Sequence, residues 1–268
     1  MGSGSPRPAL RRPKLVRPGW AASIPQPDDW APYDTIAFCM VVWNDAERAE
    51  KLLEWVRPWF RTLAVAVQES PDNTLEVVRS LADIVVEDKH WGYGDASFGP
   101  RLLPMVTHRW TFKVDADEWP DEELLSSLGD AVKAADAKPT KGVWIPFRSF
   151  TDGIEWKQFH AHLRLFHTSV GWPGSLHSRP PIEDGIQHTV GHLHHRRSLD
   201  EMIRDYLEYY RVGRGNGQWE EHNLLMMREA CKGMAAEFGW DYVHKFDWWP
   251  EVQGLAFTGE DKGVLPEY

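Results

Sequence analysis

The feature that most constrains the fold is a repeated order of a short apolar segment followed by a helical pattern. Residues 36–43 (IAFCMVVW) form a continuous apolar run, which predicts a strand buried on both faces. Asn44, with Glu47 three residues later, can cap a helix, and Pro58 lacks the amide hydrogen that would continue it. The regular part of the chain therefore begins as a strand followed by a helix.

The same order recurs up to residue 150. Further strands are expected at 63–68, 82–87, 110–119 and 142–150, with helices after Ser70-Pro71 and at 102–106 and 121–135. Strands that alternate with helices are joined by right-handed crossovers. The sequence thus predicts an α/β fold with a mostly parallel central sheet flanked by helices, and ligands of such sheets bind at the carboxyl ends of the strands.

The pattern changes after Phe150. Residues 154–167 alternate like a hairpin, and 169–185 are rich in Gly and Pro, which predicts a functional loop. Ser198 and Glu201 can form a reciprocal cap for the next helix, and a helical pattern returns at 218–235. We expect a basic, Pro/Arg-rich arm at 1–34, the α/β domain at 35–215 and a helical, Trp-rich extension at 216–268.

Composition excludes several classes of protein. With 30 basic and 40 acidic side chains the formal net charge is −10, which argues against a nucleic-acid-binding surface over the whole molecule. The apolar runs are far shorter than the roughly 20 residues of a membrane-spanning helix, so no membrane span is expected. Two cysteines cannot build a disulfide framework or a four-thiolate zinc site, and a reducing cytoplasm is the expected location.

The stretch FKVDADEW, residues 112–119, carries the most chemistry. Side chains in a strand repeat with a period of two, so Asp115 and Asp117 point to the same side. Carboxylate oxygens favour Mg²⁺ or Mn²⁺, and Mg²⁺ completes its shell with water and phosphate oxygens. The alternative is that these acids only cap the following helix or stay solvated.

This strand follows, by about eighty residues, a buried strand that ends in Asn44-Asp45, and helices lie between the two. That arrangement resembles the nucleotide-sugar-dependent glycosyltransferases of the GT-A fold, in particular the family 2-like group, over residues 35–210. The resemblance implies a metal-dependent enzyme that moves a sugar from a nucleotide diphosphate donor, expected to be a UDP-sugar, to an acceptor hydroxyl with inversion. Asp115 and Asp117 would form its DxD motif, with Asp115 at the ribose and Asp117 on the metal.

The resemblance also implies a donor site at the strand ends. Asn44 and Asp45 would lie under the base, and Glu69 would take the place of the family's usual Asp near the base or ribose, with Asp72 as the second choice. Arg101, in the segment GYGDASFGPR, would approach the diphosphate unless it is a surface charge. Trp172 could stack on a sugar or base, or simply pack.

A family histidine that completes the metal or diphosphate site is expected in GHLHHRRS. His194 is the first choice, because it shares a face with His192 and opposes Leu193; His195 stays an alternative. A chance zinc site of His188 and His192 is a further alternative.

An acceptor-side base is expected in the loop before this segment. The candidates there are Asp184, Glu183 and His177, since a carboxylate or imidazole within hydrogen-bond reach can deprotonate a hydroxyl.

The sequence leaves the acceptor open among glycans, proteins, small molecules and modified DNA. The basic arm and the 15 Trp keep a modified DNA base as an alternative acceptor. A second alternative is an inactive nucleotide-sugar-binding or glycan-binding protein of the same fold. A phosphohydrolase or nucleotidyltransferase that uses the same acids is a third, which the absence of a Walker pattern disfavours.

Overall fold

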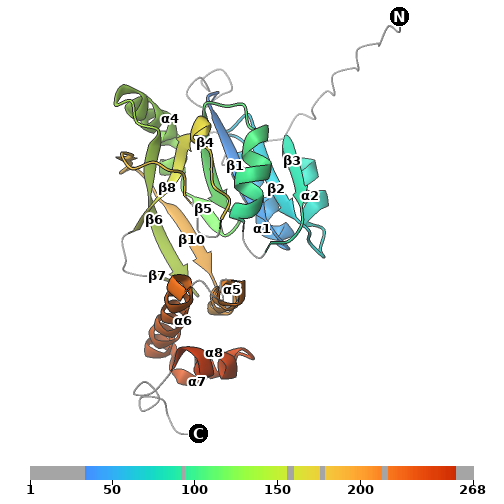
Figure 1. The fold of residues 1–268 in the computed structure, drawn as a ribbon, viewed down its shortest axis with the longest axis vertical. Helices are drawn as coiled ribbons and strands as arrows, with labels where there is room; N and C mark the ends of the chain where they lie inside the picture. The colour runs from blue at the N-terminus through green and yellow to red at the C-terminus, as the bar shows by residue number, and fades with distance from the viewer. Residues whose placement is uncertain (1–33, 92–93, 156–159, 176–178, 213–216, 258–268) are drawn as a thin grey trace, which may run out of the picture.

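The computed structural model describes residues 34–91, 94–155, 160–175, 179–212 and 217–257, and Figure 1 shows their arrangement. The first half of the chain alternates strands and helices. Its elements are β1 (Ile36–Val42), α1 (Ala46–Val56), β2 (Leu63–Gln68), α2 (Thr74–Leu81), β3 (Ile84–Asp88), β4 (Trp110–Asp115), β5 (Glu118–Pro120) and α4 (Glu122–Ala137). The expected arm at 1–34 lies almost entirely outside the described residues.

The strands form one sheet in the order β3-β2-β1-β4-β8-β6-β10-β5. Its later strands are β6 (Gly142–Thr151), β7 (Ile154–Glu155), β8 (His160–His167), β9 (Ile186–Gln187) and β10 (Leu193–Arg197). The half from β3 to β4 is parallel. The other half is mixed, because β8 runs antiparallel to both β4 and β6. The predicted α/β class, a central sheet flanked by helices, is confirmed.

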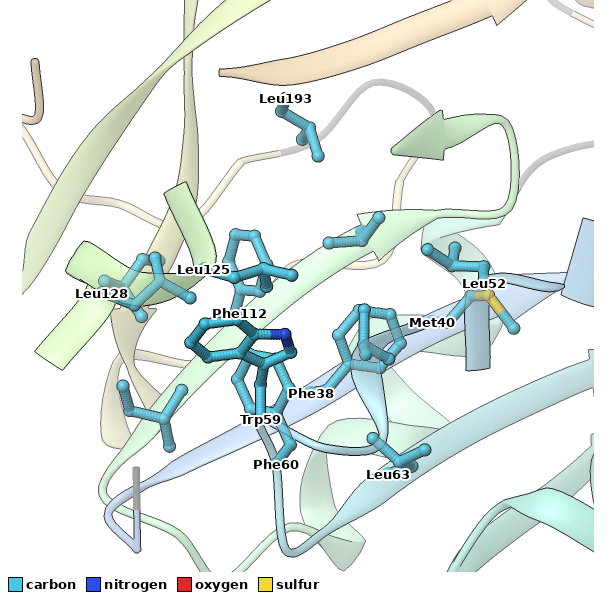
Figure 2. Packing of buried hydrophobic residues seen from close by; sticks show 14 of the residues in the cluster. Phe38, Met40, Leu52, Trp59, Phe60, Leu63, Phe112, Leu125, Leu128 and Leu193 are labelled. Carbon is cyan, nitrogen blue, oxygen red and sulfur yellow. The ribbon is translucent and has the colours of Figure 1, made fainter. Parts of the chain in front are cut away.

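The apolar side chains of β1 are buried on both faces of the sheet, which explains the unbroken hydrophobic run of this strand. Phe38 and Met40 pack with α1, α4 and β4 on one face, while Cys39 and Val41 pack on the other against Phe98 and its neighbours. Figure 2 shows the first of these clusters around Phe38 and Phe112. Fully burying a side chain of this size contributes about 1.5–3 kcal/mol. The two clusters hold the strand ends in fixed positions.

Of the two helix caps expected from the sequence, one lies a residue later than expected and the other is confirmed. Asp45, not Asn44, caps α1: its carboxylate accepts from the Arg48 amide at 3.1 Å, whereas Asn44 adopts a φ of 48°. The reciprocal cap of Ser198 and Glu201 at the start of α5 (Leu199–Val212) is confirmed, with hydrogen bonds of 2.8 and 3.1 Å.

The helix expected at 102–106 is wrong in its type. Residues 102–106 span the end of a π-helical turn (Phe98–Leu102) and a 3₁₀ turn (Leu103–Met105), which follow the short helix α3 (Asp95–Ser97). Pro100 and Pro104 have no amide hydrogen to donate, so a regular α-helical ladder cannot form here.

The carboxy-terminal helices have a core of their own. They comprise α5, α6 (Gly217–Phe238), α7 (Trp240–His244) and α8 (Trp249–Ala256), which lie beyond the ends of β6 and β10 in Figure 1. Their cluster buries Leu207, Met234 and Trp249. Within the described residues, none of the helices is both long and apolar enough to cross a membrane.

Gly191 is a position where the backbone requires glycine. Its φ is 70°, and a Cβ there would overlap the Leu124 backbone nitrogen and lie 2.5 Å from an Asp121 carboxylate oxygen. We expect Gly191→Ala to lower the free energy of unfolding by about 3 kcal/mol, from the combined left-handed strain and overpacking. Urea denaturation measures this change.

The matched control is Gly153→Ala. Gly153 has a φ of 85°, but nothing lies within 4 Å of its added Cβ. Strain alone should cost it about 1 kcal/mol. Equal losses in the two variants would show that the close approach to Asp121 and Leu124 does not matter.

Candidate active site

The carboxyl ends of the parallel strands meet at one edge of the sheet. The Trp43 indole donates to the Glu69 carbonyl at 3.1 Å, and the Asn44 amide donates to Ser70 Oγ at 2.9 Å, so the segments after β1 and β2 lie together. Asp115 pairs in register with Val41 at the end of β1. The structure thus places Asn44, Asp45, Glu69 and Asp115 along the same edge, as their positions after the strands predict.

Asp115, whose own side chain is 33% exposed, contacts a cluster of more deeply buried charges. Its carboxylate binds Lys113 Nζ at 2.7 Å and an Arg164 guanidinium nitrogen at 2.8 Å, and its amide donates to Glu118 Oε2 at 2.9 Å. Arg164 also forms an ion pair with Glu118, whose side chain is only 3% exposed. Burial opposes ionisation of Asp115, but Lys113 and Arg164 outweigh it and lower its pKa to about 2.

Asp117 has a different set of partners, because a tight turn separates β4 from β5. Its Oδ2 lies 2.7 Å from His195 Nε2 and 3.5 Å from Arg197 Nε, both on β10. Burial alone would raise the pKa of Asp117, but His195, Arg197 and Arg48 more than compensate and hold it well below its usual range. The two aspartates are therefore both ionised, each against separate cations.

The three neighbouring histidines do not share one role. His194, the first choice from the sequence, lies on the other side of β10, where its Nε2 is 3.3 Å from Asp121 Oδ2. Asp121 also caps α4 and accepts from the His192 amide at 2.9 Å. Because side chains alternate along a strand, only His195 can face Asp117. This geometry favours His195 over His194.

Arg48 connects this edge of the sheet to the carboxy-terminal helices. Its guanidinium lies 3.3 Å from Asp45 and 2.5 Å from Glu201 at the start of α5. Sequence reasoning missed Arg48, Lys113 and Arg197. A lysine between apolar residues of β4 was the one available signal, since such a residue is almost never buried unless it is paired.

Two residues that were expected to bind the sugar donor, Arg101 and Trp172, have other contacts. Arg101 is 57% exposed and approaches Asp88 at 3.8 Å, and no described contact joins it to Asp115 or Asp117. Trp172 is buried, and its ring packs edge to face on Phe98 at 5.1 Å. Packing is therefore its observed role, beneath Lys113, whose Nζ lies 5.2 Å from the indole centre.

The structure does not bring the expected acceptor-side acids to this edge. The Asp184 carbonyl accepts from Thr140 Oγ1 at 2.7 Å, just before β6 begins. Phe166 of β8 pairs with Gly142 of β6 on one side and with Thr111 of β4 on the other, so Gly142 and Thr111 lie at the same level of the sheet. Thr111 is four residues before Asp115 in β4. At about 3.3 Å per residue, Asp184 and its neighbour Glu183 lie more than roughly 13 Å away along the strand direction. His177 lies outside the described residues.

The arrangement can bind a polar ligand with both negative and positive parts. Oxygen atoms of Asp115 and Asp117 can accept hydrogen bonds or coordinate a cation. Within the described residues, no group of three His, Cys, Asp or Glu side chains is placed to hold a metal ion. Asp117 and His195 bring one oxygen and one nitrogen donor together, so a metal there would need further ligands from water or substrate.

Sequence comparison finds glycosyltransferases. The chain is 20% identical over 147 residues to glycosyltransferase SunS of Bacillus phage SPbeta, and equally to the prophage-derived SunS of Bacillus subtilis strain 168. The matched part covers 54% of this chain and 35% of SunS, so the chain spans about a third of the length of these curated relatives. No family model matches the chain.

Structural comparison finds solved structures of low sequence identity to this chain. S. aureus TarS 1-349 has a TM-score of 0.45 and 13% identity, with 82% of this chain and 78% of that chain covered. Glucosyl-3-phosphoglycerate synthase from Mycobacterium tuberculosis, solved with Mn²⁺, UDP and phosphoglyceric acid, has a TM-score of 0.33 and 16% identity, with 44% of each chain covered. As the resemblance predicted, the curated proteins that this chain matches in sequence are glycosyltransferases.

Proposed function

We propose that this protein is a metal-dependent glycosyltransferase that moves a sugar from a nucleoside diphosphate to an acceptor hydroxyl. The observation that carries the proposal is the pair of aspartates at the carboxyl ends of the strands, each with its own basic partners. Asp117 faces His195 and Arg197, while Asp115 is held by Lys113 and Arg164. The sequence similarity to SunS supports the same reaction class.

In this proposal the nucleoside lies over the ends of β1 and β2. Asn44, Asp45 and Glu69 surround the base, and Asp115 accepts hydrogen bonds from the ribose. Because Lys113 and Arg164 fix the Asp115 carboxylate, little side-chain freedom is lost when the ribose binds. The donor class to test first is a UDP-sugar.

The residues present fit a divalent ion that is shared with the donor. Asp117 supplies an oxygen and His195 a nitrogen, and diphosphate oxygens with water would complete the shell of Mn²⁺ or Mg²⁺. When bound, such an ion neutralises negative charge on the departing diphosphate. Arg197 and Arg48, both close enough to lower the pKa of Asp117, add positive charge at the same place. We infer direct displacement at the anomeric carbon, with inversion.

The first test is binding of nucleotides. UDP with Mn²⁺ at a hundred times its Kd should stabilise the protein by about 2.7 kcal/mol and raise Tm by roughly 5 °C or more. His195→Ala and Asp117→Asn should lose the part of the shift that requires Mn²⁺, because each removes one of the two proposed ligands. Differential scanning fluorimetry with UDP, CDP, GDP and ADP, each with and without Mn²⁺, measures it.

The matched control is His194→Ala, which removes the adjacent imidazole on the opposite side of β10. Each variant is compared with its own Tm without nucleotide, so a loss of basal stability does not enter. A Mn²⁺-dependent shift that survives in His195→Ala and vanishes in His194→Ala would show that His194, not His195, is the metal ligand.

Turnover separates an enzyme from an inactive binding protein of the same fold. The wild-type protein should release UDP slowly from a UDP-sugar even when water is the only acceptor. Asp117→Ala should reduce this release by at least about a hundredfold, a size typical of losing one charge-stabilising group. Release of UDP is followed by a coupled assay, and equal rates in the two proteins would exclude catalysis at Asp117.

Arg164 should matter for stability as well as for the donor. Arg164→Met leaves Glu118 and Asp115 without their shared cation, and we expect a loss of about 3–5 kcal/mol in the free energy of unfolding. Arg79→Met is the control, because it breaks an exposed ion pair with Glu87 and should cost less than about 1 kcal/mol. Urea denaturation compares the two variants.

A further inference from the structure

A pocket separate from the aspartate pair lies between the sheet and the carboxy-terminal helices. Its volume is about 450 Å³, within the range of small-molecule sites. Trp43 and His90, which follow β1 and β3, form one side of it, and residues of α5, α8 and the segment before α8 form the other. Neither Asp115 nor Asp117 lines this pocket.

The side formed by the sheet is a fixed aromatic surface. Trp43 and His90 stack with ring centres 4.1 Å apart and an interplanar angle of 20°. The Trp43 indole is held by the Glu69 carbonyl, and His90 Nδ1 lies 3.2 Å from Gln68 Oε1. Trp43 nevertheless remains 47% exposed. An exposed ring in a fixed orientation can pack on a flat ligand without losing much side-chain entropy.

The side formed by the helices adds Tyr209 and Trp248. The Trp248 indole donates to Asp200 Oδ1 at 2.8 Å, and its ring stacks on Phe246 at 5.0 Å. The pocket therefore has aromatic rings on both sides. Rings of this kind pack well on the C–H faces of a sugar.

The charges in the pocket disfavour a phosphate-bearing ligand. Two guanidinium groups, Arg204 and Arg211, line it beside four carboxylates. Arg204 binds Asp247 at 2.7 Å, and Arg211 binds Glu251 at 2.9 Å. Both cations are thus already compensated, and the lining has an excess of negative charge. Carboxylates and paired guanidinium groups can still exchange hydrogen bonds with neutral hydroxyl groups.

One residue connects the pocket to the aspartates. Asp205 lines the pocket and accepts from Arg197 at 2.8 Å, and Arg197 in turn lies 3.5 Å from Asp117. A ligand in the pocket that reached Asp205 would therefore be one side chain away from the place assigned above to the donor diphosphate.

We propose that this pocket binds the acceptor and that the acceptor end it holds is an uncharged sugar ring. The proposal rests on the proposed function, because it assigns the second substrate of that reaction. Trp43 and Tyr209 contact the faces of the ring, and the carboxylates bind its hydroxyl groups. Asp205, held by Arg197, contacts the side of the ring that faces the donor.

The test is direct binding of simple sugars by isothermal titration and saturation-transfer NMR. The probes are methyl glycosides of glucose and N-acetylglucosamine, with glucose 6-phosphate as the anionic comparison, each with and without UDP and Mn²⁺. We expect at least one neutral glycoside to bind and glucose 6-phosphate to bind more weakly. Trp43→Ala and Tyr209→Leu should each raise the Kd of the neutral glycoside about tenfold.

Trp91→Ala is the control, because Trp91 is also exposed, at 39%, but does not line the pocket. Its Kd should match that of the wild type. Failure of every neutral glycoside to bind, tighter binding of glucose 6-phosphate, or unchanged affinity in both pocket variants would overturn the proposal. Failure of the proposed function is a separate result, since UDP would then give no Mn²⁺-dependent shift in Tm.

Discussion

The candidate site depends on compensation of buried charge at the edge of the sheet. Asp115 and Glu118 share Arg164, and Asp117 is paired with Arg197 and hydrogen-bonded to His195. Removing one partner of such a pair leaves a charge that is costly to bury. The strands must therefore present their acids and cations together, and this requirement connects β4, β8 and β10 more tightly than apolar packing alone would.

Two hydrophobic clusters, one on each face of the sheet, hold that edge in place. A third cluster, in the carboxy-terminal helices, lies beyond it. Arg48, bound to Asp45 and Glu201, and Arg197, bound to Asp205, connect the sheet edge to α5. Because α5 also forms one side of the pocket, the position of this helix relative to the strands determines how close a ligand in the pocket lies to the aspartates.

Much of the fold could be predicted because its signals are local. The buried runs of β1 and β2, the cap at Ser198 and the acids that end β4 can all be recognised within a few residues. The antiparallel insertion of β8 could not, because strand order depends on which surfaces pack together. The acceptor-side role expected of Asp184 came from its place in the sequence, whereas β9 places it at the opposite end of the sheet.

The sequence by itself determined the α/β class and the acids at the strand ends, because the apolar pattern of neighbouring residues is enough to identify a buried strand and its end. Only the tertiary structure decided which basic side chains face those acids. His195 rather than His194 lies at Asp117 because β10 pairs with β5 in a register that puts His195 opposite Glu118. It also decided that Trp43 and Tyr209, 166 positions apart in the printed sequence, line one pocket. Such contacts depend on the packing of distant segments, which no local pattern encodes.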